Sequence, residues 1–466
     1  MHASIWTLAW PAMLEFGLQT IVQYADLFMV GGLGTEATAI VGITAQLHFL
    51  IKFPISSMSV GVLVNIAKAM GEKNSQEIRR TSMQTVFISL LIGMVGTIAA
   101  YAICPILPIL LNMDGELKKG FLQYYMISYS TLILFTIGSM FAAVLRAVED
   151  MKSPMFINGF VNILNIILNA IFIYPGESVR IGKLKVFLPG FGLGIIGSAI
   201  ATAIAIGSGG IMMLLKVYYN PLATMRHEKL KPDLQLIKDL LKISIPAGLS
   251  SFVNGSGRLI FTSFVTGIGI TAAAAHSIAL TIEGFFYIPA VGVEKAVTVL
   301  AGTYLGEKNE KKLVDMTKAA TILACGMMFV LGVLLLVFSG AFTVIFTKDS
   351  GVASLSAQML RIVALTEPFL ALSLVMEGAF QGLGNTKTPF WASTVSMWFF
   401  RVGICYILTV YLHLGLASVW ICMIADNACR GYLLTRQFVR KKWKNQFQLV
   451  PEMKEPENLT QKSNEK

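Results

Sequence analysis

The sequence predicts an all-α integral membrane protein with about twelve transmembrane helices in two pseudo-symmetric six-helix bundles. Hydrophobic residues make up 55% of the chain and charged residues only 14%, whereas ordinary globular proteins carry roughly 25% charge. Apolar runs recur at about the 20 residues that a helix needs to cross a hydrocarbon core of ~30 Å. These runs are too long and too continuous for barrel strands, which alternate over ~10 residues. Sequence motifs also repeat at one fixed spacing, which indicates two related halves.

Each half is expected to hold six spans. The spans of the first half lie at about 5–32, 38–68, 83–110, 121–147, 153–175 and 192–217, and those of the second at about 238–268, 273–303, 316–346, 354–382, 387–412 and 414–438. A polar, basic linker, 218–237, separates the bundle 1–217 from the bundle 238–440. The tail 441–466 is polar and charged, which is typical of a disordered segment.

The distribution of basic residues predicts the orientation in the membrane. Loops after even-numbered spans, and the tail, carry Lys and Arg at positions 73, 79, 80, 146, 152, 226, 229, 231, 308, 311, 312, 387, 440, 441, 442 and 444. The loops after spans 1, 7 and 11 have none, and the exceptions are positions 118, 119, 180, 183 and 185. Because positive loops stay in the cytoplasm, we expect both termini there and the chain in the cell membrane. The net charge of +11 therefore does not indicate a nucleic-acid partner.

An internal repeat is the strongest feature of the sequence. Residues 70–74 read MGEKN and residues 305–309 read LGEKN, a spacing of 306 − 71 = 235. The same spacing links Pro11 to Pro246, Gly32 and Gly34 to Gly267 and Gly269, Pro54 to Pro289, and the segment 152–154 to 387–389. Six spans per copy is an even number, so both copies enter the membrane in the same sense. A parallel duplication of this kind is typical of a transporter with its substrate site between the halves.

Asp26 is the clearest candidate for chemistry in the first span. An ionisable group inside a span costs about 2.5–3.5 kcal/mol on insertion scales, so it indicates function. An apolar environment favours the neutral form of a carboxyl group, which suits a group that loads and releases a proton. Gln23 lies one turn earlier, and Pro11, which removes a helix hydrogen bond, is a candidate hinge. The alternative for Asp26 is a carboxylate hydrated by water at the outer membrane interface. The alternative for Pro11 is a kink with a purely structural role.

The fifth span carries three amides in an apolar helix. Asn165 and Asn169 are four residues apart and Asn162 lies three residues before Asn165, so we expect them to share a face. They are candidates to line a cavity, and Thr202 in the sixth span is placed to reach the same space. Hydrogen bonds between packed helices are the alternative role for these side chains.

The second half does not repeat this chemistry. The position equivalent to Asp26 is Phe261, and this half instead has charged residues at varied depths, of which Arg258, Glu283, Glu367 and Asp426 are secondary candidates. Arg258 and Glu283 lie in adjacent expected spans and are expected to pair. Glu15, Lys52 and Lys68 of the first half have no clear role from sequence alone.

Motifs of soluble enzymes do not occur. The sequence has no Walker A motif, no HExxH and no GxSxG, so we expect neither an enzyme nor an ATP site, and no cofactor. The five cysteines have no paired spacing, which predicts neither a disulfide nor a metal site. An ion gradient is then the natural energy source.

Several segments together resemble the multidrug and toxic compound extrusion (MATE) family. They are residues 25–31 (ADLFMVG), 274–280 (AAHSIAL), 305–309 (LGEKN) and 382–389 (GLGNTKTP), the last with Asn385 where the family pattern has Asp. The resemblance spans nearly the whole chain. It implies two bundles around a central cavity and alternating access, with Na⁺ or H⁺ entering as an organic cation or other amphiphile leaves.

The resemblance also implies roles for single residues. In one branch of the family the first-helix aspartate couples transport to the ion, and Asp26 matches it. Asn165 and Thr202 match that branch as well, so a Na⁺ site near these three residues is one expectation. Asn169 stands where the branch has an aspartate, and the loss of one carboxylate favours H⁺. Another branch uses a glutamate in the seventh helix, where this chain has Asn254.

Four functions compete on this evidence. An H⁺- or Na⁺-coupled antiporter that exports small organic, cationic or amphiphilic compounds as a monomer fits best. A flippase for lipid-linked oligosaccharides, from the same superfamily, should need several cavity arginines. A channel should show matching polar residues in both repeats, which Asp26 and Phe261 do not, and an intramembrane enzyme lacks a catalytic constellation. The sequence does not name the substrate, because promiscuous cavities have no readable code.

Overall fold

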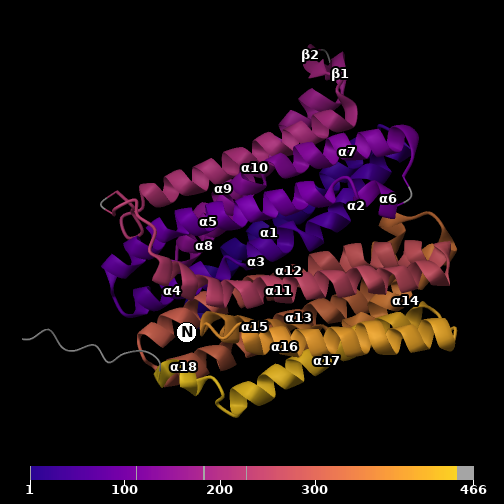
Figure 1. Ribbon diagram of the computed structural model, residues 1–466. Coiled ribbons are helices and arrows are strands. Elements are labelled where there is room, and N and C mark those ends of the chain that lie inside the picture. Colours follow the sequence, from indigo (N-terminus) through magenta and orange to yellow (C-terminus); the bar gives the residue numbers. More distant parts are fainter. Residues whose placement is uncertain (1, 112, 182–183, 227, 449–466) are drawn as a thin grey trace, which may run out of the picture.

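Two helical bundles lie side by side with their helices running nearly parallel (Figure 1). The computed structural model describes residues 2–111, 113–181, 184–226 and 228–448. The N-terminus and the C-terminal helix lie at one end of the molecule, called here the termini end, and a β-hairpin projects from the opposite end (Figure 1).

Six span-length elements build the first half. They are α1 (His2–Gly31); the broken helix α2 (Thr35–Leu50), α3 (Lys52–Ser57) and α4 (Val60–Gly71); α5 (Ser75–Ile103); the bent pair α7 (Gly115–Ser130) and α8 (Leu132–Ala147); α9 (Lys152–Ile173); and α10 (Gly194–Tyr218). The short helix α6 (Leu107–Leu110) follows α5. The bend between α7 and α8 is 41°.

The second half repeats this arrangement. Its elements are α11 (Leu234–Ile268); α12 (Ile270–Gly306); α13 (Glu310–Phe346); the pair α14 (Ser350–Ala364) and α15 (Glu367–Gly382); α16 (Lys387–Ser396) with the π-helical segments η1 (Met397–Ile404) and η2 (Ile407–Tyr411); and α17 (Leu416–Val439). The pair α14–α15 is bent by 56°. The architecture predicted from the sequence, twelve span-length helices in two copies, is therefore confirmed.

Nine of the twelve elements are long and apolar enough to cross a membrane, when each bent pair counts as one span. The other three, α1, α11 and α17, are equally long but carry polar and charged side chains, among them Asp26, Arg258 and Asp426. Such side chains inside a membrane almost always face the protein interior or a hydrated cavity. The polar character of these three helices therefore marks where the chemistry of the molecule is concentrated.

Three details differ from the sequence prediction. The third helix, α5, begins at Ser75 rather than near residue 83, because Asn74 caps its first turn by accepting a hydrogen bond from the Glu77 amide at 3.1 Å. An antiparallel hairpin of β1 (Pro175–Ile181) and β2 (Leu184–Phe191) joins α9 to α10. Packed structure also continues past residue 441: Trp443 is buried and α18 spans Lys444–Gln448. The remainder of the expected tail, 449–466, lies outside the described residues.

The basic linker is anchored to the first half where it enters α11. The side chain of Gln84 donates to the Lys231 carbonyl oxygen at 2.9 Å and accepts from the Asp233 amide at 2.9 Å. Asp233 in turn caps α11 by accepting from the Leu236 amide at 3.1 Å, and it forms an ion pair with Arg80. This anchor fixes the entry of α11 against α5.

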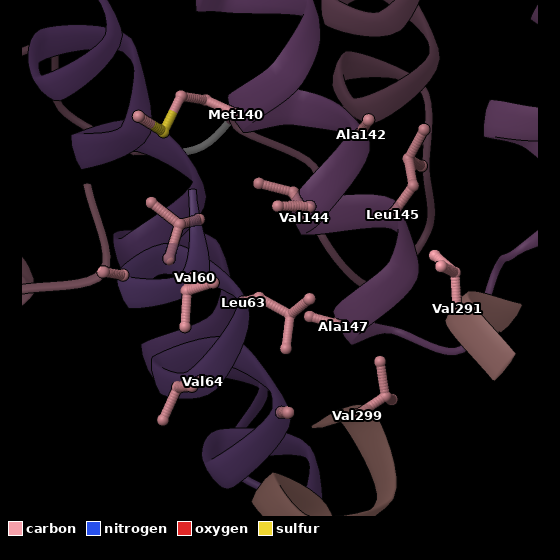
Figure 2. Close-up of a cluster of buried hydrophobic side chains, with 14 of the residues drawn as sticks. Val60, Leu63, Val64, Met140, Ala142, Val144, Leu145, Ala147, Val291 and Val299 are labelled. Carbon is pink, nitrogen blue, oxygen red and sulfur yellow. The ribbon is translucent and has the colours of Figure 1, made fainter. Parts of the chain in front are cut away.

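A continuous apolar core joins the halves at the termini end. Valines and leucines of α4, the residues 140–147 of α8, and Val291 and Val299 of α12 converge in it (Figure 2). A second apolar cluster is confined to the second half and includes Phe261, Leu360 and Trp420. The interface between the two halves, called here the seam, is thus firmly packed at the termini end.

Two glycines mark the closest approach of the halves. A Cβ atom on Gly71 of α4 would overlap the Thr303 carbonyl oxygen and lie 2.8 Å from the Glu307 nitrogen, both on α12. A Cβ atom on Gly306 of α12 would overlap the Lys68 carbonyl oxygen and lie 2.9 Å from the Glu72 nitrogen on the first half. Toward the opposite end, a Cβ atom on Gly34, Gly42, Gly267 or Gly269 would meet nothing within 4 Å. The helix ends are therefore packed at the termini end and have space around them at the other.

Candidate functional site

Asp26 lies near the C-terminal end of α1, against α9. The side-chain amide of Asn169 donates to its Oδ1 atom at 2.6 Å. The side-chain amide of Asn165 lies between Asp26 and Thr202, and its orientation is assigned from these neighbours. With the oxygen accepting from the Thr202 hydroxyl at 3.2 Å, its nitrogen lies 2.7 Å from Asp26 Oδ1 and donates to it. The structure thus brings Asp26, Asn165, Asn169 and Thr202 together from three helices, and their role in coupling stays a prediction.

The electrostatic setting of Asp26 is unusual for a carboxylate in a membrane span. Asn169 is fully buried and Asn165 nearly so, and no basic side chain of the described residues forms an ion pair with Asp26. Its charge is therefore held by amide N–H groups alone, which point toward it. A charge-assisted hydrogen bond is stronger than a neutral one, so the pair of amides is a preorganised receptor for the charged form.

Tyr124 is a further member of this site that the sequence analysis missed. It projects from α7, is buried, and lies close to Asp26 and to the hydroxyls of Ser128 and Ser198. The only sequence signal was a tyrosine in an apolar segment, which many packed helices share. Its phenol adds a polar group on the side of the site that faces α10.

Gln23, Asn162 and Pro11 lie apart from this cluster. Gln23 is exposed on α1, and the Asn162 amide nitrogen is buried without a hydrogen-bond partner among the described residues. Two of the three asparagines therefore contact Asp26, while the role of Asn162 stays a prediction. Pro11 is buried inside a continuous α1, one turn from the backbone that packs against Gly292 of α12.

The charged residues of the second half form a separate buried network. The carboxylate of Asp426 on α17 forms ion pairs with Arg401, whose Nε lies at 2.6 Å, and with Arg430, whose Nη2 lies at 3.3 Å. The π-helical segment η1 places Arg401 on this face, where its guanidinium also lies 5.6 Å from the Phe261 ring centre. Such π-helical turns occur frequently at functional sites. The sequence analysis named Asp426 but not Arg430, which lies one turn later on the same helix.

The predicted pair of Arg258 and Glu283 is wrong as an ion pair. Among the described residues no nitrogen of Arg258 lies within 4.0 Å of a carboxylate, and its guanidinium instead lies 5.4 Å from the Phe49 ring of the other half. Glu283 nevertheless lies close enough to Arg401 and Arg258 to interact electrostatically with both. Glu367, fully buried on α15, has no hydrogen-bond partner for either carboxylate oxygen in the described part of the chain.

The residues without a clear role in the first half have distinct surroundings. Glu15 is buried and accepts from Arg146 and from Asn158, each at 2.6 Å. Lys68 pairs with Glu72 at 3.7 Å. Lys52 is buried among aromatic rings and belongs to a different group of side chains, which is described below.

A family model matches both halves of the chain. The model described as MatE matches residues 11–171 and again residues 246–407. Together the two matches cover most of the sequence, and their first residues are 246 − 11 = 235 positions apart. The chain belongs to the MatE family. This MATE transporter is therefore a multi-pass membrane protein of a transporter family, built from two copies of one unit.

Curated relatives share the full length of the protein. It is 29% identical over 450 residues to a probable multidrug resistance protein NorM of Thermotoga maritima, with 96% of this chain and 94% of the relative covered. It is 25% identical over 446 residues to the uncharacterized transporter YisQ of Bacillus subtilis, with 94% of each chain covered. Both matches extend across the two repeats and the linker.

Solved structures of MATE transporters share the fold. A crystal structure of MATE in complex with MaL6 superposes with a TM-score of 0.86 at 21% identity, covering 96% of this chain and 97% of that one. A MOP superfamily transporter from Pyrococcus furiosus, described as having a binding pocket of reverse polarity, superposes with a TM-score of 0.85 at 22% identity, covering 96% of each chain. These likenesses establish the two-bundle fold of this transporter.

Proposed function

We propose that this transporter is an H⁺-coupled antiporter that exports small amphiphilic organic compounds, with Asp26 as the coupling group. The observation that carries the proposal is that Asp26 of the first helix is held by amide groups of α9 without a basic partner among the described residues, whereas Glu15 of the same helix is paired with Arg146. The names of relatives such as the NorM protein of Thermotoga maritima support multidrug export.

The donors around Asp26 favour a proton over Na⁺. Hard cations require oxygen ligands, whereas Asn169 and Asn165 direct nitrogen atoms at the carboxylate, and the Asn165 oxygen faces Thr202. The Asn169 amide oxygen, which is buried without a hydrogen-bond partner among the described residues, and the Thr202 hydroxyl also lie at this site, but both are neutral. The Asp26 carboxylate would therefore be the one negative ligand for an ion. A proton needs no such set of ligands.

Protonation would disturb this arrangement directly. A charged carboxylate accepts hydrogen bonds only, and two amide N–H groups already serve it; a protonated carboxyl group becomes a donor on one oxygen. Both amides are directed at Oδ1, and loss of the negative charge weakens these charge-assisted hydrogen bonds, so α1 and α9 lose part of their connection. In this proposal, that local change is coupled to the packing of α1 on α12, and hence to the seam between the halves.

Alternating access would then open the seam at the termini end. The contacts of Gly71 and Gly306 lie there, and the opposite end of the seam has open space around its glycines. We assign the termini end to the cytoplasm from the positive loops, the protein to the cell membrane, and the functional unit to a monomer. The bundle limits 1–217 and 238–440 stay predictions, as does the hinge at Pro11.

A flippase for lipid-linked oligosaccharides is the weaker proposal. Binding a pyrophosphate would need several free arginines in the cavity. Two of the three arginines in the second-half network, Arg401 and Arg430, are paired with Asp426. Only Arg258 is left for an anionic head group.

The test is transport by the purified protein in sealed proteoliposomes. A cationic fluorescent dye is followed under an imposed pH gradient and, separately, under an imposed Na⁺ gradient. The proposal expects efflux with the pH gradient and little with Na⁺. Efflux driven by Na⁺ alone would contradict the choice of ion, and dye that stays in place under both gradients would contradict export of cationic amphiphiles.

A further inference from the structure

Lys52 is a buried cation near the middle of the second span. It follows the break at Ile51 that separates α2 from α3, within an element that runs over Thr35–Gly71. Its side chain is only 7% exposed, and no carboxylate of the described residues lies within 4.0 Å of its ammonium group. The two acidic side chains of α1 are already engaged, Glu15 by Arg146 and Asp26 by its amides.

Aromatic rings surround the ammonium group without neutralising it. Lys52 Nζ lies 5.3 Å from the ring centre of Tyr129 on α7 and 5.9 Å from that of Phe135 on α8. A cation–π contact stabilises by about 2 kcal/mol when desolvated, whereas burying an ion costs several kcal/mol even after relaxation. The rings therefore offset only part of the cost, and a buried charge is expected to have a counter-charge.

Three more polar groups gather on the same side of α2 and lack partners. Thr44 and His48 lie four residues apart on one face of α2, and Lys52 follows just past the break at Ile51. Thr44 Oγ1, His48 Nε2 and the Tyr129 hydroxyl are all buried without a hydrogen-bond partner among the described residues. The His48 ring lies 5.6 Å from the Tyr129 ring, edge to face, and Lys52 Nζ lies 5.3 Å from the centre of the same ring, so both side chains lie against one tyrosine.

Each member of this group can donate a hydrogen bond. The ammonium group has three donors and no acceptor, the hydroxyls of Thr44 and Tyr129 each have one, and a neutral imidazole has one. Every unpartnered buried group costs about 1–3 kcal/mol, so three such groups beside the ammonium group of Lys52 together indicate a missing acceptor. A cation together with several donors and no carboxylate is the composition of an anion site.

We propose that Thr44, His48, Lys52 and Tyr129 bind a small inorganic anion, of which chloride is the most abundant in cells. The bound anion neutralises Lys52 at the helix break and accepts the unpartnered donors. The site has no counterpart in the second half, because the positions 235 residues after His48 and Lys52 are Glu283 and Tyr287. It is independent of the proposed direction and substrate of transport.

Thermal unfolding of the purified full-length protein tests the site. Unfolding temperatures are measured in potassium chloride and in potassium gluconate at equal ionic strength. A ligand that binds only the folded state raises stability as its concentration passes its Kd, so the native protein should show a saturable increase with chloride. The same increase is expected with bromide. Equal unfolding temperatures in chloride and in gluconate at every salt concentration measured would overturn the proposal, because water alone would then fill the site.

Matched variants separate a specific site from a general salt effect. Lys52→Met keeps the shape of the side chain and removes the charge, so its unfolding temperature should no longer respond to chloride and should match that of the native protein or exceed it in gluconate. Thr44→Val and Tyr129→Phe each remove one donor and should weaken the apparent affinity about tenfold. Lys68→Met, which alters a half-exposed lysine paired with Glu72 on the same span, should keep the native response. A chloride response retained in Lys52→Met would overturn the proposal.

Bromide locates the anion directly. Crystals of the full-length protein grown in bromide should give an anomalous peak beside Lys52 Nζ that is absent in Lys52→Met. Bromide peaks confined to other parts of the molecule would overturn the assignment. This measurement does not depend on transport, so it stands whether or not the protein proves to be a proton-coupled exporter.

Discussion

Gly71 and Gly306 each pack against the helix that carries the other, in a reciprocal contact. Gly71 lies against Thr303 and Glu307, and Gly306 lies against the residues 235 positions before those two, Lys68 and Glu72. The repeat seen in the sequence is thus a two-fold relation in space, with the paired glycines at its closest point. No side chain fits between these backbones, so the contact is specific for glycine.

Gly306→Ala should therefore force the halves apart at the termini end. Overpacking costs about 1–3 kcal/mol in typical cores, and here the obstacle is backbone that cannot rotate away. Spin labels on Gln76 and Lys311, exposed residues at equivalent positions of the repeats, should report a longer distance in the variant. Gly326→Ala, where the new Cβ meets nothing within 4 Å, is the control. An unchanged distance in Gly306→Ala would show that this contact does not hold the halves together.

Arg146→Met should destabilise the protein by about 3–5 kcal/mol, because it leaves Glu15 buried without its charged partner. The double variant Glu15→Gln with Arg146→Met removes both charges and should recover much of the loss. Chemical or thermal unfolding in detergent measures both effects. A double variant as unstable as the single one would mean that Arg146 acts through packing rather than through its charge.

The linker anchor should respond to pH in a defined direction. Hydrogen bonds from the Leu236 amide and from Arg80 hold the pKa of Asp233 below its ordinary value. A carboxylate with a lowered pKa in the folded state adds stability above its unfolded pKa and loses it as the pH falls through the folded value. The difference in unfolding temperature between native protein and Asp233→Asn should thus be largest near neutral pH and shrink under acid. A difference that grows on acidification would contradict this assignment.

Asn169→Asp should move the ion preference toward Na⁺. The substitution places a second carboxylate beside Asp26 and replaces an amide donor by oxygen atoms, which are the ligands that a hard cation needs. Dye efflux driven by a Na⁺ gradient should therefore increase relative to efflux driven by a pH gradient. Asn162→Asp, at an asparagine outside the cluster, is the control. An unchanged ratio in Asn169→Asp would mean that the donor atoms around Asp26 do not decide the ion.

The helices and the repeat could be predicted from the sequence because each leaves a pattern there: helices as long apolar runs, and the repeat as short motifs at one fixed spacing. Asn165 and Asn169 were placed on one face by their spacing, and Asp26 was marked by its apolar surroundings. Contacts between distant segments had no such signal. Tyr124 beside Asp26, the guanidinium of Arg258 on Phe49, and the two arginines on Asp426 depend on how bent and π-helical segments pack. The β1–β2 hairpin was not predicted either. The sequence analysis noted that loop only because its positive charges are an exception to the distribution of basic residues.

The most direct test of coupling at Asp26 compares two activities of the Asp26→Asn variant: export of dye against its own gradient, and exchange of dye at equal concentrations on both sides. Proteoliposomes with native protein, Asp26→Asn, or the exposed-site control Asp239→Asn are loaded with a cationic dye. Efflux against a dye gradient under an imposed pH gradient is compared with exchange at equal dye concentrations. We expect native protein and Asp239→Asn to do both, and Asp26→Asn to retain exchange but lose uphill efflux. Uphill efflux that persists at the native rate in Asp26→Asn would contradict the central role of this carboxyl group and move the coupling site to Glu283, Glu367 or Asp426.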